Sequence, residues 1–194
     1  MVWANDDVFA EKENLIKPGP AEHQPATFGH KGQVYDGWET RRRRGVTAES
    51  HDSAVIRLGV PAVVRGVVVD TAWFTGNYPP EISVEAAFVE GYPSVQELIE
   101  DHGKTDWTTI VERCAVNGDT RNPFPTSSSR RWTHLRLSIY PDGGVARFRV
   151  HGEGLINPDF AENMTLDLAA LENGGRITAC SNMFYSSPNN LLLP

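Results

Sequence analysis

Stretches rich in valine and isoleucine, each closed by glycine or proline, dominate the middle of the chain. Two of them, Ala54–Gly59 and Ala62–Asp70, are separated by Val60-Pro61 and predict two consecutive strands. Further runs of β-branched and aromatic residues predict strands at Ile82–Glu90 and Trp107–Arg113. The apolar pattern therefore predicts a chain built mainly from short strands.

Helical spacing of apolar residues is scarce. Ser94–Asp101 and Leu166–Glu172 each predict about two helical turns, and Ser94 stands three residues before Glu97 as in a capping box. Many short strands with Gly/Pro-rich turns are typical of an all-β antiparallel sandwich or barrel. At 194 residues the chain is long enough for one such domain.

The clearest local pattern is a predicted β-hairpin, His134–Tyr140 and Val145–His151, joined by the turn residues 141–144. Both strands alternate with period two, which predicts one face in the core, made by Leu135, Leu137, Ile139, Ala146, Phe148 and Val150. A symmetric closure pairs the polar residues as Ser138 with Arg147, Arg136 with Arg149, and His134 with His151. Like charges that face each other destabilise a sheet. Either acidic side chains of a neighbouring strand offset them, or the polar face lines a cleft that binds an anion.

The net charge is −7, and 40% of the residues are hydrophobic. An acidic chain argues against nucleic acid or an anionic membrane as a main partner. Two cysteines cannot form a disulfide framework, and no signal peptide or long apolar segment is apparent. We therefore expect a soluble cytoplasmic protein with no membrane partner.

One internal repeat is present, because Asn14–Pro18 recurs as Asn190–Pro194 at an offset of 176 residues. We interpret residues 1–165 as a first repeat and residues 166–194 as the opening segment of a second, truncated one. The alternative is two unrelated loops. At the same offset the first repeat lacks a lead-in segment, so we expect Arg176–Cys180 to fill a sheet edge near Met1–Ala4, within its own chain or in a neighbour.

The most unusual local string is Tyr35–Arg44, which places four arginines after Asp-Gly-Trp-Glu-Thr. The acidic balance of the chain disfavours a nucleic-acid patch, which leaves a solvated loop or a ligand site. In the second reading Asp36, Glu39 and the forked guanidinium of Arg41 hold and protonate a small polar anion.

Three further residues are candidates for the same site. Asp70 ends an apolar strand and Asn77 lies in an aromatic and Pro-rich turn, where ordinary strand-end capping with a hydrophobic plug is the alternative to a site role. Arg57 lies among apolar residues where it needs a partner or a pocket. The six histidines lack the spacing of a zinc site, so we expect neither a metal nor a cofactor.

Taken together, these strings resemble the allantoicase family. The matching motifs are Asp36–Arg42, Ile56–Gly59, Asp70-Thr71 with Phe74–Pro79, and Arg136–Gly152. The likeness covers nearly the whole chain. One departure is Ser53, where the family often has tryptophan.

The resemblance implies two tandem repeats, each a jelly-roll-like β-sandwich of the galactose-binding type. It also implies hydrolysis of allantoate, a ureide, to ureidoglycolate and urea, in a homo-oligomer. For this substrate we expect Glu39 or Asp70 to exchange protons together with His134. The expected substrate-binding residues are Asp36, Arg41, Arg57, Asn77, Arg136 and Arg149. The alternative is a non-catalytic sandwich that binds a small anionic or sugar-like ligand.

Overall fold

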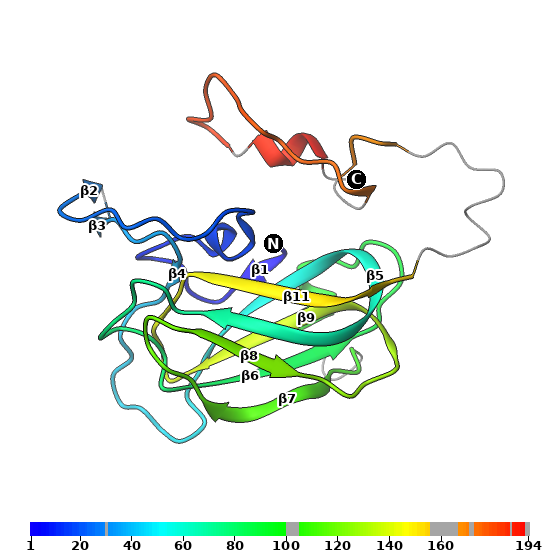
Figure 1. Ribbon diagram of the computed structural model, residues 1–194, viewed down its shortest axis with the longest axis horizontal. Helices are drawn as coiled ribbons and strands as arrows, with labels where there is room; N and C mark the ends of the chain where they lie inside the picture. Colours follow the sequence, from blue (N-terminus) through cyan, green and yellow to red (C-terminus); the bar gives the residue numbers. More distant parts are fainter. Residues whose placement is uncertain (30, 100–104, 156–166, 171–172, 187, 193–194) are drawn as a thin grey trace.

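The fold is an antiparallel β-sandwich, seen in a computed structural model that describes residues 1–29, 31–99, 105–155, 167–170, 173–186 and 188–192. Figure 1 shows its two layers, with the N-terminal segment and the C-terminal segment on the same side of them. The expectation of an all-β fold is confirmed. None of the helices in the described ranges is long and apolar enough to cross a membrane.

A single long strand, β5 (Asp52–Asp70), belongs to both layers. Its first part pairs with β1 (Trp3–Ala4) and β9 (Arg131–Tyr140), and its second part pairs with β8 (Arg121–Pro125) and β11 (Arg147–Gly154). The prediction of two separate strands here was wrong. The register shifts between Arg57 and Ala62 instead, so the Val60-Pro61 segment bends the strand without ending it. Proline is tolerated at such an irregularity because it has no backbone N–H to pair.

The remaining strands complete the larger layer in the order β1-β5-β9-β6-β7. Strands β6 (Glu81–Ala87) and β7 (Thr108–Ala115) lie close to the predicted ranges. The core between the layers buries the predicted apolar faces. Leu135, Leu137 and Ile139 are fully buried, Phe148 packs with them and Val150 does so in part, and Ala146 is also buried.

The predicted hairpin was wrong, because β9 and β11 lie in different layers. β9 lies between β5 and β6, while β11 pairs with the second part of β5. The connection between them forms its own short strand, β10 (Gly144–Val145), which pairs with β4 (Trp38–Glu39). The turn-rich connection is thus used to cross between layers. Period-two alternation is the same for either arrangement, so it could not tell a hairpin from this crossing.

The smaller elements lie around the sandwich. Strands β2 (Phe28–Gly29) and β3 (Gly32–Gln33) form a separate ribbon, and α1 (Val95–Ile99) begins with the predicted capping box. In that box the Ser94 backbone donates to Glu97 at 2.7 Å and the Glu97 backbone donates to Ser94 Oγ at 3.3 Å. Of the second predicted helix, residues 166, 171 and 172 lie outside the described residues, and residues 167–170 form a turn.

Two 3₁₀ helices, η1 (Lys12–Ile16) and η4 (Pro188–Leu192), lie near the two ends of the chain. Residues 175–180 form no strand, so they do not complete the sheet edge within their own chain. That part of the expectation for Arg176–Cys180 was wrong. An exchange of this segment with a neighbouring chain stays a prediction.

Candidate active site

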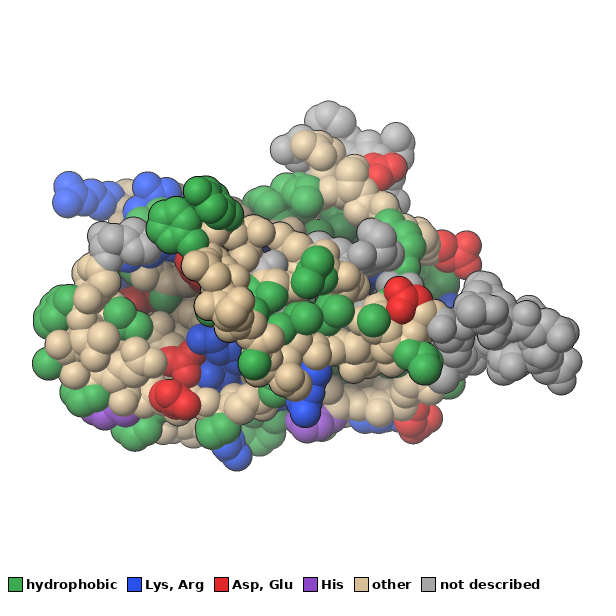
Figure 2. Space-filling view, turned by 90° about the horizontal axis from the view of Figure 1, so that it is seen from above, with side chains coloured by type: hydrophobic (Ala, Val, Ile, Leu, Met, Phe, Trp, Pro, Cys, Tyr) green, Lys and Arg blue, Asp and Glu red, His purple; other side chains and the backbone are tan. Residues whose placement is uncertain are grey.

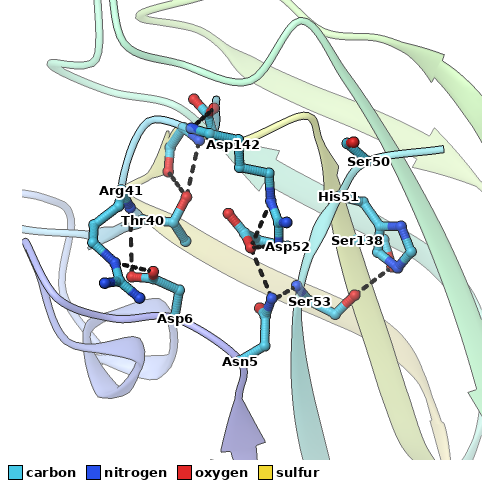
Figure 3. Close-up of polar contacts among 12 residues, drawn as sticks. Asn5, Asp6, Thr40, Arg41, Ser50, His51, Asp52, Ser53, Ser138 and Asp142 are labelled. Atoms are coloured by element: carbon cyan, nitrogen blue, oxygen red, sulfur yellow. Dashed lines mark hydrogen bonds and ion pairs between the residues drawn. The ribbon is translucent and has the colours of Figure 1, made fainter. Parts of the chain in front are cut away.

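A polar hollow of about 300 Å³ lies at one end of the sandwich, where β4 leads into the arginine run (Figure 3). Its lining residues are Asn5, Asp6, Arg41, Arg42, Arg43 and Asp52. Close packing of the residues before the arginines fixes the position of the arginine run at the hollow. Gly37 leaves no room for a side chain, because a Cβ would come within 2.6 Å of Phe74. Trp38 is fully buried and its Nε1 donates to the carbonyl of Asp6 at 2.7 Å.

Each arginine of the hollow is anchored on a different carboxylate. Arg41 Nε donates to Asp6 at 2.6 Å, and Arg42 Nη1 donates to Asp142 at 2.9 Å. Arg43 binds Asp52 through Nε at 3.1 Å and through Nη2. Three separate anchors hold the guanidinium groups apart around one space.

These carboxylates are largely removed from solvent. The side chains of Asp52 and Asp142 are 2% and 3% exposed, and Asn5 also donates to Asp52 at 2.7 Å. Burial works to raise the pKa of Asp6, but the hydrogen bond from Arg41 and the surrounding N–H donors outweigh it and hold the pKa below its ordinary value. Asp6 is therefore ionised at neutral pH, and the hollow presents fixed charges of both signs.

Glu39 and Asn77 lie beside this hollow and contact each other. Asn77 Nδ2 donates to Glu39 Oε1 at 2.7 Å, and the carbonyl next to Asn77, that of Gly76, accepts from Arg42 at 3.2 Å. Burial raises the pKa of Glu39, and the hydrogen bond from Asn77 and the charge of Arg42 only partly offset it. A carboxyl group that holds its proton more tightly than usual is suited to general acid–base chemistry.

Asp70 is placed at the end of β5, as expected for a strand-end carboxylate. Its Oδ1 accepts from the backbone of Ala72 at 2.9 Å, and Arg121 lies 3.5 Å from its other oxygen. Its backbone carbonyl accepts from Ala146 at 2.8 Å. These contacts cap the strand and place Asp70 outside the lining of the hollow.

Asp36 and Arg149 hold the N-terminal segment against β11. Asp36 accepts from Arg147 at 2.6 Å and from Lys17 at 3.1 Å. Arg149 donates to the carbonyls of Leu15 and Gly19 at 3.1 and 3.0 Å. Seen from above, basic and acidic side chains lie next to each other on the surface (Figure 2). Both predicted binding residues thus have protein partners of their own.

His134 lies inside the sheet at a distance from the hollow. It lies six positions before Tyr140 along β9, about 20 Å at the rise of a strand. Its side chain is 1% exposed, and Thr133 Oγ1 lies 2.9 Å from its Nδ1. Burial and the neighbouring charge of Arg57 lower its pKa to about 4. The imidazole is neutral at pH 7, and the structure does not bring it together with Glu39.

The remaining two arginines also have protein partners. Arg136 donates to Glu85 of the adjacent strand at 2.7 Å and covers the ring of Trp107. Arg57 covers the ring of Tyr92 at 4.1 Å. For Arg136 the first of the two sequence readings, an acidic side chain on a neighbouring strand, is confirmed.

Sequence reasoning missed most of the lining of the hollow, namely Asn5, Asp6, Arg42, Arg43 and Asp52, and it also missed Asp142, the carboxylate that anchors Arg42. Two signals were available. Arg42 lies in the same motif as Arg41, and Asp142 lies in the turn motif after Tyr140. Within the described residues no group of three or more His, Cys, Asp or Glu side chains is arranged to hold a metal ion.

The sequence model of the allantoicase repeat matches residues 1–155, which include every residue of this hollow. The chain belongs to the allantoicase family. Probable allantoicases of Nocardia farcinica and Streptomyces coelicolor are 56% and 54% identical to it over its whole length. The chain covers 57% and 53% of those two proteins, so it spans about half the length of these allantoicases.

Solved structures agree with this assignment. The crystal structure of allantoicase from Saccharomyces cerevisiae is 35% identical, with a TM-score of 0.67 over 99% of this chain and 55% of that one. A module named CBM32-3, from a family 31 glycoside hydrolase of Clostridium perfringens, is 12% identical. Its TM-score is 0.51 over 78% of this chain and 89% of the module. The allantoicase repeat therefore has the expected galactose-binding type of sandwich.

Proposed function

We propose that the protein that contains this chain hydrolyses allantoate to ureidoglycolate and urea, as part of purine catabolism. The observation that carries the proposal is the hollow of three anchored arginines beside the Glu39–Asn77 pair, in a member of the allantoicase family. In this proposal the arginines of the hollow bind allantoate, and Glu39 exchanges protons with it.

The substrate suits a site with charges of both signs. Allantoate carries one carboxylate and two ureido groups on a single sp³ carbon. Arg41 is held through Nε, and its Nη1 and Nη2 make no hydrogen bond to the described residues, so this end can grip a carboxylate with two parallel bonds. The N–H and C=O groups of the ureido arms need acceptors and donors, which Asn5 and Asn77 supply nearby.

The reaction forms one C–O bond to water and breaks one C–N bond to the departing urea. Water loses a proton, and the urea nitrogen gains one, so the overall reaction needs no outside oxidant or reductant. Glu39 is the proposed carrier of that proton, because burial lets its carboxyl group be protonated more readily than an exposed one. Asn77 orients Glu39 through the bond to Oε1.

The other predicted site residues take supporting roles in this proposal. Asp70 caps β5, while Asp36 and Arg149 hold the N-terminal segment. His134, Arg57 and Arg136 stabilise the sheet. Only Glu39, Asn77 and Arg41 of the original set contact substrate in this scheme.

We further propose that residues 166–194 open a second repeat. η4 (Pro188–Leu192) lies 176 residues after η1 (Lys12–Ile16), the same offset that relates the two sequence copies. Leu15 is fully buried, whereas its counterpart Leu191 is 82% exposed. An apolar side chain of this kind is suited to packing against a second sandwich.

Four further expectations belong to the same proposal. The protein acts in the cytoplasm, as a homo-oligomer, without nucleic acid and without a cofactor. Light scattering of the purified protein measures the oligomer, and activity after exhaustive chelation tests the last expectation.

The test of function is urea release from allantoate. It is measured on the 194-residue chain and on any longer protein that contains it, since the family members it matches are about twice as long. Stoichiometric urea and ureidoglycolate are expected from the longer protein. If both forms bind allantoate and neither releases urea, the non-catalytic binding module replaces the hydrolase.

A further inference from the structure

The two carboxylate oxygens of Asp6 accept hydrogen bonds from different groups. Oδ1 accepts from the backbone N–H of Val8 at 3.1 Å, which closes a local turn, and from the distant backbone N–H of Arg41 at 3.4 Å. Oδ2 accepts from Arg41 Nε at 2.6 Å. Figure 3 shows the Asp6 carboxylate beside the guanidinium of Arg41, on the side that faces Asn5 and Asp52.

The second copy of the repeated segment allows the two roles of Asp6 to be compared. At the repeat offset of 176, Asp6 corresponds to Asn182 and Val8 corresponds to Phe184. Asn182 Oδ1 accepts from the backbone of Phe184 at 2.8 Å, the same turn bond that Asp6 makes to Val8. An asparagine therefore suffices for the turn, and the turn alone does not require a negative charge.

The negative charge of Asp6 forms an ion pair with Arg41. Burial of the Asp6 side chain, which is 10% exposed, costs free energy, and the ion pair with Arg41 offsets part of it. The Arg41 side chain is 64% exposed, so its own packing does not fix the guanidinium. A carboxylate on Nε leaves the Nη1/Nη2 end of the group pointing away from its anchor, which is the geometry that bidentate binding of a second carboxylate needs.

We infer that Asp6 is a positioning residue that aims Arg41 at the substrate carboxylate, and that only the first copy of the repeated segment is equipped for this task. This inference rests on the proposed function for the identity of the anion. An asparagine in place of Asp6 keeps Oδ1 for the turn and turns an N–H₂ group toward Arg41, where donor faces donor. The turn is retained, but the guanidinium of Arg41 loses the hydrogen bond that orients it.

Asp6→Asn is the decisive variant, and Asp7→Asn is its matched control. Asp7 pairs with Lys12 at 3.2 Å, is partly exposed, and does not line the hollow. The first measurement needs no ligand: ¹⁵N relaxation of the Arg41 Nε–H group. We expect an ordered group in the unchanged protein and in Asp7→Asn, and a mobile one in Asp6→Asn. Equal order in all three would overturn the inference.

The second measurement is the affinity for N-carbamoylglycine, a probe with one carboxylate and one ureido group. Asp6→Asn should weaken binding roughly tenfold, the usual scale for losing a hydrogen bond to a charged group. A double-mutant cycle with Arg41→Ala separates direct from indirect action, because Asp6→Asn should have no further effect once Arg41 is gone. Equal losses in both backgrounds would refute positioning through Arg41.

Failure of the proposed function has a different signature. If the complete protein releases no urea, the relaxation of Arg41 Nε–H still decides whether Asp6 orders this guanidinium. If urea is released with an unchanged KM in Asp6→Asn, the function stands and the positioning role falls.

Discussion

Asn77 Nδ2 donates a 2.7 Å hydrogen bond to Glu39 Oε1, across 38 positions of sequence. Glu39 belongs to β4 and Asn77 to the turn that follows β5, and the crossing strand β10 joins the two regions. The backbone carbonyl of Asn77 accepts from Gly144 at 2.7 Å, while Gly144 lies opposite Glu39 in the β4–β10 pair. Glu39 is thus held by Asn77 on its side chain and by the crossing strand β10 on its backbone.

Replacement of Glu39 by glutamine should lower turnover of allantoate roughly 100-fold or more, because the amide cannot exchange the proton. Affinity for the substrate should change little, because glutamine keeps the contact to Asn77. Turnover and KM of the complete protein are the measurements. Glu85→Gln is the control, since Glu85 pairs with Arg136 away from the hollow. Full turnover in Glu39→Gln would remove Glu39 from the mechanism.

The difference in stability between the unchanged protein and Glu39→Gln should depend on pH in a defined direction. The pKa of Glu39 is raised above its ordinary value of 4.5, so the folded state binds this proton more tightly than the unfolded state. Stability relative to Glu39→Gln is therefore greatest below pH 4.5 and is lost as the pH rises through the folded pKa. Urea denaturation at several pH values measures it. A difference that grows with pH would contradict a raised pKa.

His134 should destabilise the fold on acidification. Its pKa is lowered from 6.5 to about 4, so the folded state favours the neutral ring. The contribution is fully present above pH 6.5 and is lost as the pH falls toward 4, by up to about 3 kcal/mol. His134→Asn should flatten this dependence in denaturation curves. It should also retain turnover per folded molecule, and a 100-fold loss in a folded variant would restore His134 to catalysis.

The buried pair of Arg147 and Asp36 should contribute strongly to stability. Their side chains are 3% and 7% exposed, and the contact is 2.6 Å. Arg147→Met removes the buried partner of Asp36, which keeps only the more exposed Lys17 as an ion-pair partner, and should cost about 3–5 kcal/mol. Arg65→Met is the control, because Arg65 and Glu153 form an exposed pair that is worth less than about 1 kcal/mol. Equal losses of unfolding free energy in the two variants would contradict a special role for the buried pair.

Two arginines compete for the role of carboxylate ligand, and a lysine at each position distinguishes them. Arg41→Lys removes the Nη fork from the hollow and should weaken binding of N-carbamoylglycine roughly tenfold. Arg136→Lys alters a contact with Glu85 on the sheet and should leave affinity nearly unchanged. Titration followed by NMR measures both. The reverse order of losses would move the carboxylate site to Arg136.

The sequence by itself determined the class of fold, the core faces of the strands and the family. Leu135, Leu137 and Ile139 could be placed in the core because alternation of apolar and polar side chains is a local property of a strand. The capping box of Ser94 and Glu97 is local in the same way. The motifs also located the neighbourhood of the hollow, since Arg41 and Asn77 both come from them.

Only the tertiary structure decided which charged groups meet. The pairing of β9 with β6 brought Arg136 next to Glu85. The crossing at β10 separated Arg136 from Arg149. It also placed Glu39 against Asn77. Asp6, Asp52 and Asp142 come from three distant segments and anchor three adjacent arginines. Alternation records which face of a strand is buried but not which strand lies beside it, so the partners of these side chains follow from long-range pairing alone.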